Sequence, residues 1–256
     1  MPRTRLDTVM LERGLVPTRE RARALILAGQ VKVNGNVLSK AGAPVAEDAV
    51  VELVTPDHPY VGRGGIKLAH ALDAFAIDVT GRCALDIGAS TGGFTDVLLQ
   101  RGASTVVALD VGHGQLDWRL RNDPRVVVRE GVNARALTRD DVPCSVGLVT
   151  IDVAFISLRH VLPAVPKVLT ADADVVALVK PQFEAGRDQV GRGGIVSDPA
   201  VHEAVLAQVT SAAAAAGFRR VAMTPSPITG AEGNREFFLR RRVLWPCPAS
   251  QAAYSP

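Results

Sequence analysis

The sequence predicts an α/β protein with a mostly parallel sheet, preceded by a small α+β domain. From residue 81 onward, apolar strand patterns alternate with helical patterns, as in parallel sheets covered by helices on both faces. Residues 1–54 instead combine two short helical patterns with a hairpin signal and carry an excess of positive charge. We therefore expect a small domain at 1–54, a linker at 55–61, a large domain at 62–246 and a tail at 247–256.

Composition places the chain among folded proteins without a membrane segment. It has 256 residues, of which 47% are hydrophobic and 21% are charged. No run approaches the roughly 18 consecutive apolar residues of a membrane span, and the amino terminus lacks the apolar core of a signal peptide. Cys83, Cys144 and Cys247 match neither a disulfide framework nor a paired metal motif. We therefore expect a cytoplasmic protein without a bound metal.

The elements of the small domain follow from helical spacing and turn signals. "RLDTVMLERG" predicts a helix that ends at Gly14. "PTRERARALILAGQ" predicts a second helix, capped by Thr18, whose buried side includes Ala24, Leu25, Leu27 and Ala28. Asn34-Gly35 in "VKVNGNVL" suits a two-residue hairpin turn, and residues 49–54 can add another strand.

The amino-terminal forty residues are strongly basic. They hold eight Lys or Arg and three Asp or Glu, a net charge of +5, so the rest of the chain sums to −2. A compact basic module indicates a polyanionic partner, and a cluster of this kind favours RNA. The residues expected to face RNA are Arg3, Arg5, Arg19, Arg21, Arg23, Lys32 and Lys40.

The elements of the large domain are predicted from apolar runs and their periods. Short apolar runs predict strands, and longer segments with helical spacing predict the helices between them. The expected strands are 84–88, 104–110, 125–129, 146–151, 174–179, 218–223 and 235–242. The expected helices lie near 93–101, 114–121, 157–169 and 199–216. In such a sheet a ligand binds beyond the carboxyl ends of the strands, near the point where strand order reverses.

The turn "DIGASTGGF", residues 86–94, follows the first of these strands, and three ligands compete for it. A phosphate loop of the Walker type needs a lysine that the turn lacks. A dinucleotide site prefers a glycine where this chain has Ser90, which weakens that interpretation. S-adenosylmethionine carries an ammonium, a sulfonium and a ribose diol, which suit acidic and carbonyl acceptors. The glycines alone are equally compatible with an ordinary strand-to-helix turn.

Acids at the strand ends favour S-adenosylmethionine without deciding the matter. Asp86 stands at the entry of the turn, and Asp110 ends the next strand, where it could accept hydrogen bonds from both ribose hydroxyls. Dinucleotide enzymes bind ribose in the same way, so Asp110 does not discriminate. The residues expected to bind the cofactor are Asp86, Gly88, Ser90, Gly92, Phe94, Asp110 and Asn133.

Four charged residues far apart in the sequence are expected at the same edge of the sheet. Asp152 and Lys180 each follow a strand, Glu236 opens the last strand, and Lys67 follows the glycine-rich "GRGGIK". Taken singly, each is also explained as a charged residue at the end of a strand that is exposed to solvent. Together they suit proton transfer, because a lysine amine can act as a base when its ammonium form is destabilised. We expect Lys180 to be the base and Lys67 to supply a neighbouring cation.

These residues also carry a resemblance to a known family. The order Lys67, Asp152, Lys180, Glu236 resembles the catalytic tetrad of FtsJ-like ribose 2′-O-methyltransferases. "YVGRGGIKLAHALDAF", "LDIGASTGGFTDVLLQRGA", "ALDVGHGQLDWRLRNDPRV", "LVKPQFEAGR" and "GNREFFL" are similar to the TlyA family, and the basic "TRERARALILAGQVKVNG" resembles the RNA-binding module of ribosomal protein S-four. The similarity covers nearly the whole chain.

The resemblance implies a specific activity. TlyA-family members join the small RNA-binding module to a Rossmann-like domain that uses S-adenosylmethionine to methylate cytidine ribose in ribosomal RNA, on the large subunit or on both. The linker departs from the mycobacterial pattern, a basic residue and a tryptophan, because this chain has "HPYV" at 58–61. Two other functions stay open: a binding-only RNA protein, and the membrane activity implied by the family's historical haemolysin name. A dehydrogenase is a third.

Overall fold

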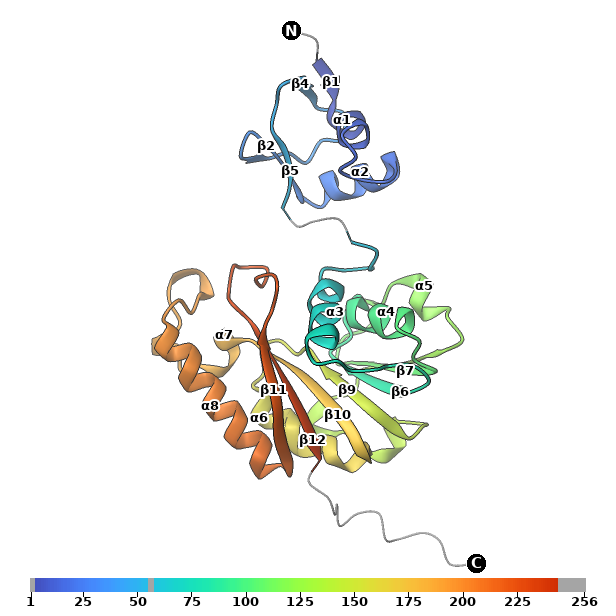
Figure 1. The fold of residues 1–256 in the computed structure, drawn as a ribbon, viewed down its shortest axis with the longest axis vertical. Coiled ribbons are helices and arrows are strands. Elements are labelled where there is room, and N and C mark those ends of the chain that lie inside the picture. The colour runs from blue at the N-terminus through green and yellow to red at the C-terminus, as the bar shows by residue number, and fades with distance from the viewer. Residues whose placement is uncertain (1–2, 55–57, 244–256) are drawn as a thin grey trace, which may run out of the picture. The chain divides into compact units, whose positions relative to one another are not determined.

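The computed structural model describes residues 3–54 and 58–243, except for the side chain of Arg220 (Figure 1). The chain forms two compact units that divide between Pro59 and Tyr60, inside the linker expected at 55–61. Residues 55–57 of that linker and the expected tail at 247–256 lie outside the described residues. Each unit is described separately below.

The first unit contains two helices and two small sheets. Its elements are β1 (Arg3–Arg5), α1 (Leu6–Glu12), α2 (Arg19–Leu27), β2 (Val31–Val33), β3 (Asn36–Val37), β4 (Pro44–Ala46) and β5 (Val51–Leu53). β1 pairs with β4, and β2 lies between β3 and β5. The predicted hairpin is confirmed, because Asn34 and Gly35 form its turn with φ of 50° and 81°. Thr18 caps α2 by accepting a hydrogen bond from the Arg21 amide at 3.1 Å.

The buried side of α2 differs from the prediction. Ala22, Leu25 and Ile26 face the core of the first unit, whereas Leu27 is 71% exposed. The spacing 22, 25, 26 is the helical i, i+3, i+4 pattern, and it points one face of α2 at α1. The prediction was right for Leu25 but wrong for Ala24, Leu27 and Ala28, which are apolar but lie on the exposed side of the helix.

The second unit is a seven-stranded sheet with helices on both faces. Its elements are α3 (Gly64–Ala74), β6 (Cys83–Ile87), α4 (Gly93–Gln100), β7 (Thr105–Asp110), α5 (Trp118–Arg121), β8 (Val126–Glu130), β9 (Val146–Ile151), α6 (Leu158–Val161), β10 (Leu169–Val179), α7 (Pro181–Glu184), α8 (Pro199–Ala215), β11 (Phe218–Pro225) and β12 (Phe237–Val243). The strand order is β11-β12-β10-β9-β6-β7-β8. β12 runs antiparallel to both of its neighbours, and the pairs from β10 to β8 are parallel.

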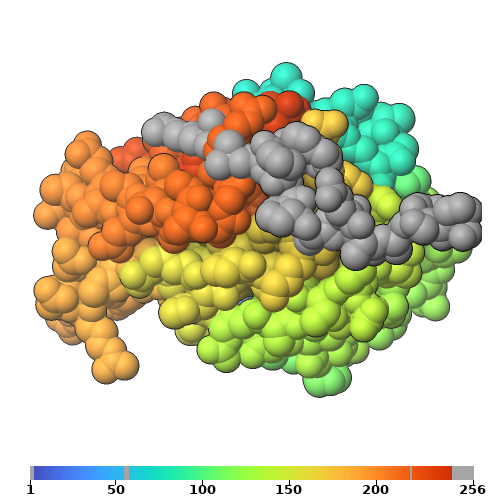
Figure 2. Space-filling model, turned by 90° about the horizontal axis from the view of Figure 1, so that it is seen from below, coloured from blue at the N-terminus to red at the C-terminus, as the bar shows by residue number. Residues whose placement is uncertain are grey.

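Alternate residues of the central strands are buried on opposite faces of the sheet. Leu85 and Ile87 pack in the cluster that contains α6 and α8, whereas Ala84 packs in the cluster that contains α3 and α4. Burial on both faces explains why these strands are continuous apolar runs. The space-filling view shows α8 (orange) beside the α6 region (yellow), which together cover one face (Figure 2). The predicted α/β class with a mostly parallel sheet is confirmed.

Two helix predictions need correction, and one helix was not predicted. The helix expected at 157–169 ends at Val161 and continues as a 3₁₀ segment, since Pro163 and Pro166 lack the amide hydrogen that an α-helix needs. The helix expected at 114–121 is only α5. The helix α3 was not predicted, because its first turn is the glycine-rich "GRGGI".

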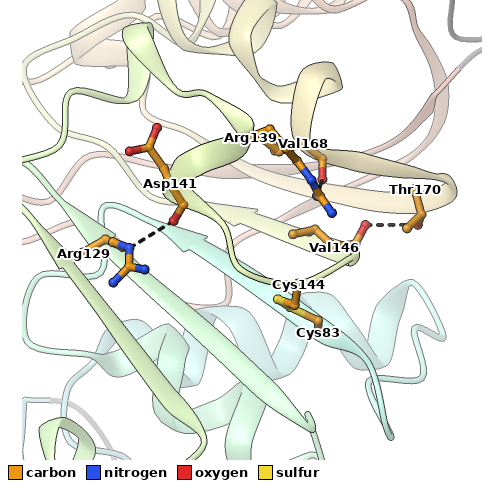
Figure 3. Close-up of a disulfide and its surroundings, with 8 residues drawn as sticks. All are labelled: Cys83, Arg129, Arg139, Asp141, Cys144, Val146, Val168 and Thr170. Atoms are coloured by element: carbon orange, nitrogen blue, oxygen red, sulfur yellow. Dashed lines mark hydrogen bonds between the residues drawn. A yellow bond between two sulfur atoms is a disulfide. The ribbon is translucent and has the colours of Figure 1, made fainter. Parts of the chain in front are cut away.

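A disulfide joins Cys83 to Cys144, contrary to the expectation from cysteine spacing (Figure 3). Cys83 begins β6 and Cys144 precedes β9, and these two strands are parallel neighbours with Cys83 paired to Val146. The Cα atoms of the cysteines are 6.5 Å apart, within the usual range for a disulfide. Sixty-one residues separate them in the sequence, so only the sheet topology reveals the pair.

Within residues 3–54 and 58–243, no helix is both long enough and apolar enough to cross a membrane. The same residues contain no group of three or more His, Cys, Asp or Glu side chains that could hold a metal ion.

Candidate active site

The strand order reverses direction between β6 and β9, at the centre of the sheet (Figure 1). β7 follows β6 on one side, while β9 lies on the other side of β6. A reversal of this kind opens a crevice at the carboxyl ends of the two central strands. The glycine-rich turn follows β6 at this point, and Asp152 is the first residue after the neighbouring strand β9. The site predicted from the sequence therefore falls where the topology leaves room for a ligand.

The glycine-rich turn brings its backbone close to neighbouring segments. Gly88 has φ of 84°, and a Cβ there would overlap the backbone oxygen of Asp152. Its amide donates to the carbonyl of Leu109 at 2.8 Å. Ser90 also adopts a left-handed conformation, with φ of 48°. The glycine at position 88 is thus required by both conformation and contact.

A cavity of about 580 Å³ adjoins this turn. Four residues predicted to bind the cofactor line it: Gly88, Ser90, Asp110 and Asn133. A smaller cavity of about 130 Å³ is lined by Phe94, by Gly64 at the start of α3, and by Asp152. Gly88, Ser90 and Asp152 line both cavities, so the two cavities adjoin each other between the turn and the end of β9.

Lys67, Asp152, Lys180 and Glu236 form two ion pairs at this edge of the sheet. Lys180 Nζ lies 2.5 Å from Asp152 Oδ1, and Lys67 Nζ lies 2.5 Å from Glu236 Oε2. The register of β10 with β12 pairs Val179 with Phe237. Lys180 and Glu236 are the next residues along these two strands, so the strand pairing links one ion pair to the other.

These charges are largely withdrawn from water. The side chains of Lys67 and Glu236 are 10% and 2% exposed, and those of Lys180 and Asp152 are 15% and 21% exposed. The charge of Lys67 is matched directly by Glu236, so it offers Lys180 less positive field than an unpaired cation would. Amines and carboxylates held in this way can move a proton and can orient a hydroxyl group.

Comparison with known proteins agrees with this arrangement. The profile of FtsJ-like methyltransferases matches residues 60–243, and the profile of the S4 domain matches residues 4–51. The chain belongs to the FtsJ-like methyltransferase family. Its sheet is that of S-adenosylmethionine-dependent methyltransferases, as the sequence predicted.

Individual relatives match almost the full length of this methyltransferase. The 16S/23S rRNA (cytidine-2'-O)-methyltransferase TlyA of Mycobacterium tuberculosis is 49% identical, over 94% of this chain and 90% of that protein. Hemolysin A of Brachyspira hyodysenteriae is 42% identical, over 91% of this chain and 97% of that protein. A solved structure from Streptococcus thermophilus, named as a hemolysin, is 44% identical and superposes with a TM-score of 0.75, covering 95% of this chain and 90% of that one. The predicted resemblance to the TlyA family is confirmed.

Two residues expected to bind the cofactor line neither of the two cavities described above. Asp86 is fully buried, and its carboxylate accepts hydrogen bonds from the hydroxyls of Thr95, at 2.7 Å, and Thr150, at 2.9 Å. Gly92, with φ of 97°, packs where a Cβ would overlap the side chain of Leu120. Asp86 organises the interior beneath the turn, and Gly92 lets the turn pack against α5.

Burial controls the protonation of Asp86. Removal from water raises the pKa of this carboxyl to about 7. The hydrogen bonds from Thr95 and Thr150 act in the opposite direction, and the negative charge of Asp152 adds to the increase. Asp86 is therefore protonated in a substantial fraction of molecules at neutral pH. The sequence could not indicate this, since an acid at the end of a strand looks the same whether it points outward or inward.

The residues Asp110 and Asn133 are fixed by local hydrogen bonds. Asp110 accepts from the amides of Ser90, at 2.8 Å, and Gly112, at 2.7 Å. Asn133 accepts from the amide of Arg135 at 3.1 Å. A carboxylate has about four acceptor positions, so Asp110 retains the capacity to accept from two hydroxyl groups.

Sequence reasoning missed the apolar walls of the large cavity. Val111 follows Asp110, and Val153, Phe155 and Ile156 follow Asp152. Their signal is position, because the first few residues after each central strand lie over the crevice. Phe155 is 92% exposed with φ of 62°, an uncommon conformation for an aromatic residue. Its ring lies 5.1 Å from that of Phe183.

Some of the residues predicted to contact RNA also make hydrogen bonds within the first unit. Arg5 and Arg19 both donate to the buried carboxylate of Asp7, with nitrogen–oxygen distances of 2.9 and 3.1 Å. Their side chains remain 51% and 47% exposed. Arg21 donates to the carbonyl of His58 at 3.3 Å. The remaining predicted contacts are exposed, except Lys32, which is half-buried: Arg3, Arg23, Lys32 and Lys40.

Proposed function

We propose that this methyltransferase transfers a methyl group from S-adenosylmethionine to the 2′-hydroxyl of cytidine in ribosomal RNA. The observation that carries the proposal is the pairing of Lys180 with Asp152 and of Lys67 with Glu236 beside the cavity at the end of β6. The reaction named for the TlyA of M. tuberculosis supports the choice of cytidine. The activity belongs in the cytoplasm, where ribosomal RNA is found.

The cavity suits the cofactor in size and in chemistry. Its volume of about 580 Å³ lies within the range of small-molecule sites. Asp110 would accept hydrogen bonds from the ribose hydroxyls, and Asn133 would contact the adenine. The backbone at Gly88 and Ser90, with the ring of Phe94 behind it, would hold the amino-acid end. When bound, the cofactor supplies a methyl group activated by a sulfonium.

Lys180 would act as the general base. In its unprotonated form the amine would take the proton of the ribose 2′-hydroxyl as the oxygen bonds to the methyl carbon and the carbon–sulfur bond of the cofactor breaks. The side chain is 15% exposed, so the proton can pass to water between turnovers. Asp152 would orient the amine through their 2.5 Å contact, and the pairing of β10 with β12 holds the Lys67–Glu236 pair next to it.

Alignment is expected to contribute more than proton transfer. General-base assistance typically contributes about 10²- to 10⁴-fold. Holding the donor methyl and the acceptor oxygen in line can contribute roughly 7–11 kcal/mol. The sulfonium is already a good leaving group, so the ion pairs matter chiefly as rigid walls that place the hydroxyl.

The first unit would bind the phosphate backbone of the RNA. The S4 domain match and the exposed arginines support this. Each phosphate neutralised adds about −0.9 to the salt slope on duplex RNA or about −0.7 on single strands. Replacing Arg19 and Arg23 with alanine should flatten that slope and leave cofactor affinity unchanged. An unchanged slope would remove these two residues from the RNA contact.

The target is proposed to lie in the large subunit, with the small subunit as a possible second target. Ribose methylation should be mapped in both ribosomal RNAs from cells with and without the gene. Loss of a cytidine 2′-O-methyl group in either RNA supports the proposal and identifies the subunit. Full retention of every ribose methyl group would refute it.

A single substitution tests the catalytic assignment. Lys180→Ala should abolish methyl transfer while binding of S-adenosylmethionine, measured by calorimetry, persists. Lys167→Ala, which changes a lysine outside the two pairs, is the matched control and should keep the normal rate. A normal rate in Lys180→Ala would remove Lys180 from the mechanism.

A further inference from the structure

Two connections at the carboxyl edge of the sheet are tied together by contacts at both ends. The β9–α6 connection, residues 152–157, carries Asp152. The β10–α7 connection begins at Lys180 and leads directly into α7. The ion pair between Lys180 and Asp152 joins them at one end, and Glu184, the last residue of α7, joins them at the other.

Glu184 makes two short hydrogen bonds to the end of the β9–α6 connection. Its Oε2 accepts from the hydroxyl of Ser157 at 2.5 Å, and its Oε1 accepts from the amide of Leu158 at 2.7 Å. The residue is 5% exposed. Burial raises the pKa of this carboxyl, while the two hydrogen bonds and the charges of Arg159 and His160 oppose the increase. We call Glu184, Ser157 and Leu158 the clasp.

The direction of the hydrogen bonds in the clasp is fixed. Ser157 Oγ accepts from the amide of Arg159, at 3.2 Å, and from its Nε, at 3.1 Å. A hydroxyl has one proton to donate, and here it goes to Glu184. An amide side chain at position 184 would bring a further N–H toward an oxygen that already accepts twice. The clasp thus requires a carboxylate, although burying one is unfavourable.

The connection held by the clasp forms part of the active site. Its amide at Asp152 donates to the carbonyl of Ile87 at 2.9 Å, which fixes the start of the connection beside β6. Val153, Phe155 and Ile156 then line the large cavity. Phe155 holds its left-handed conformation next to Phe183, the neighbour of Glu184. A strained segment of this kind keeps its conformation only when its surroundings fix both ends.

We propose that Glu184 is a positioning residue for methyl transfer. Through the clasp it fixes α7 against the β9–α6 connection, and so it fixes the distance between Lys180 and Asp152. The inference rests on the proposed role of Lys180. A misplacement of about 1 Å in such a site can reduce the rate about 10²-fold.

Two isosteric or minimal changes test the clasp: Glu184→Gln and Ser157→Ala. Each should lower kcat about 10- to 100-fold at saturating cofactor, while KM for RNA stays within about threefold, since the basic residues of the first unit are untouched. Ser157→Thr keeps the hydroxyl and should retain most of the rate. Asp174→Asn is the matched control: it also removes a buried, hydrogen-bonded carboxylate, in the middle of β10 and away from the active-site edge, and it should keep the normal kcat at assay temperatures below its melting temperature.

The outcomes separate this inference from the proposed function. Loss of kcat in Glu184→Gln, with a melting temperature no lower than that of Asp174→Asn, supports the clasp. A kcat within twofold of normal in both Glu184→Gln and Ser157→Ala, alongside an inactive Lys180→Ala, overturns the clasp and leaves the proposed function standing. A fully active Lys180→Ala removes Lys180 from the mechanism and overturns the clasp with it, because no base would remain to be positioned, while the proposed methyl transfer itself would stand.

Discussion

The buried acid Asp86 makes the stability of the methyltransferase unit depend on pH in an unusual direction. Burial raises its pKa from an ordinary value of 3.8 to about 7. The folded protein therefore holds this proton more tightly than the unfolded chain does. The stabilisation is fully present below pH 3.8 and is lost as pH rises through 7. Acids paired with cations, such as Asp174, behave in the opposite way, since their pKa is lowered.

The magnitude follows from the size of the shift. About three pKa units correspond to about 4 kcal/mol of unfolding free energy across the whole range. Between pH 5 and pH 8 about 3 kcal/mol of this should be lost. Asp86→Asn removes the titration and keeps the shape of the side chain. The stability of this variant relative to the natural protein should therefore rise by about 3 kcal/mol between pH 5 and pH 8.

Urea unfolding of the full chain, followed by circular dichroism at several pH values, measures this difference. Asp174→Asn is an opposite control. Burial alone would raise the pKa of Asp174, but hydrogen bonds from Arg242, Arg240 and Arg82 outweigh it and lower the pKa. The stabilising effect of Asp174 is present above its unfolded pKa, so its removal should cost the same at pH 5 and pH 8. If the difference in unfolding free energy between Asp86→Asn and the natural protein were the same at pH 5 and pH 8, the reasoning for Asp86 would be refuted.

Three further changes have definite expected outcomes. Asp7→Ala removes the shared partner of Arg5 and Arg19 and should destabilise the first unit by about 2 kcal/mol. Scanning calorimetry measures this, and an unchanged melting temperature for the first unit would contradict it. Gly88→Ala places a Cβ against the backbone of Asp152 at φ of 84° and should weaken S-adenosylmethionine binding at least tenfold by calorimetry. Cys83→Ser opens the disulfide and should destabilise the oxidised protein by about 4 kcal/mol, a difference that a reducing agent should abolish.

The fold was largely predictable because its elements carry strong local signals. Strands buried on both faces are continuous apolar runs, and the Asn34-Gly35 turn admits few conformations. The errors have local causes as well. Prolines 163 and 166 break a helical pattern that apolar spacing alone supports, and the glycines of "GRGGI" hide the start of α3. Leu27 was predicted to be buried but is exposed, because apolar composition alone does not indicate which side of a helix packs against the core.

The site was predictable only where it follows from strand ends. Asp110 and Asn133 line the cavity, since Asp110 ends β7 and Asn133 follows β8. By contrast Asp86, one residue before the end of β6, turns inward toward Thr95 and Thr150. The direction in which a side chain near the end of a strand points depends on tertiary packing. Glu184 gave no signal at all, because a glutamate four residues after Lys180 has the appearance of a surface charge until its partners are known.

The antiparallel direction of β12 explains why one residue of the ion pairs comes before its strand in the sequence, while two others come after theirs. Parallel strands present their carboxyl ends to the active-site edge, so Asp152 and Lys180 come directly after β9 and β10. An antiparallel strand presents its beginning to the same edge, so Glu236 comes directly before β12. Reversing β12 would carry Glu236 to the far end of the sheet and leave Lys67 without its acid. The direction of one strand therefore determines whether the second ion pair can form beside the first.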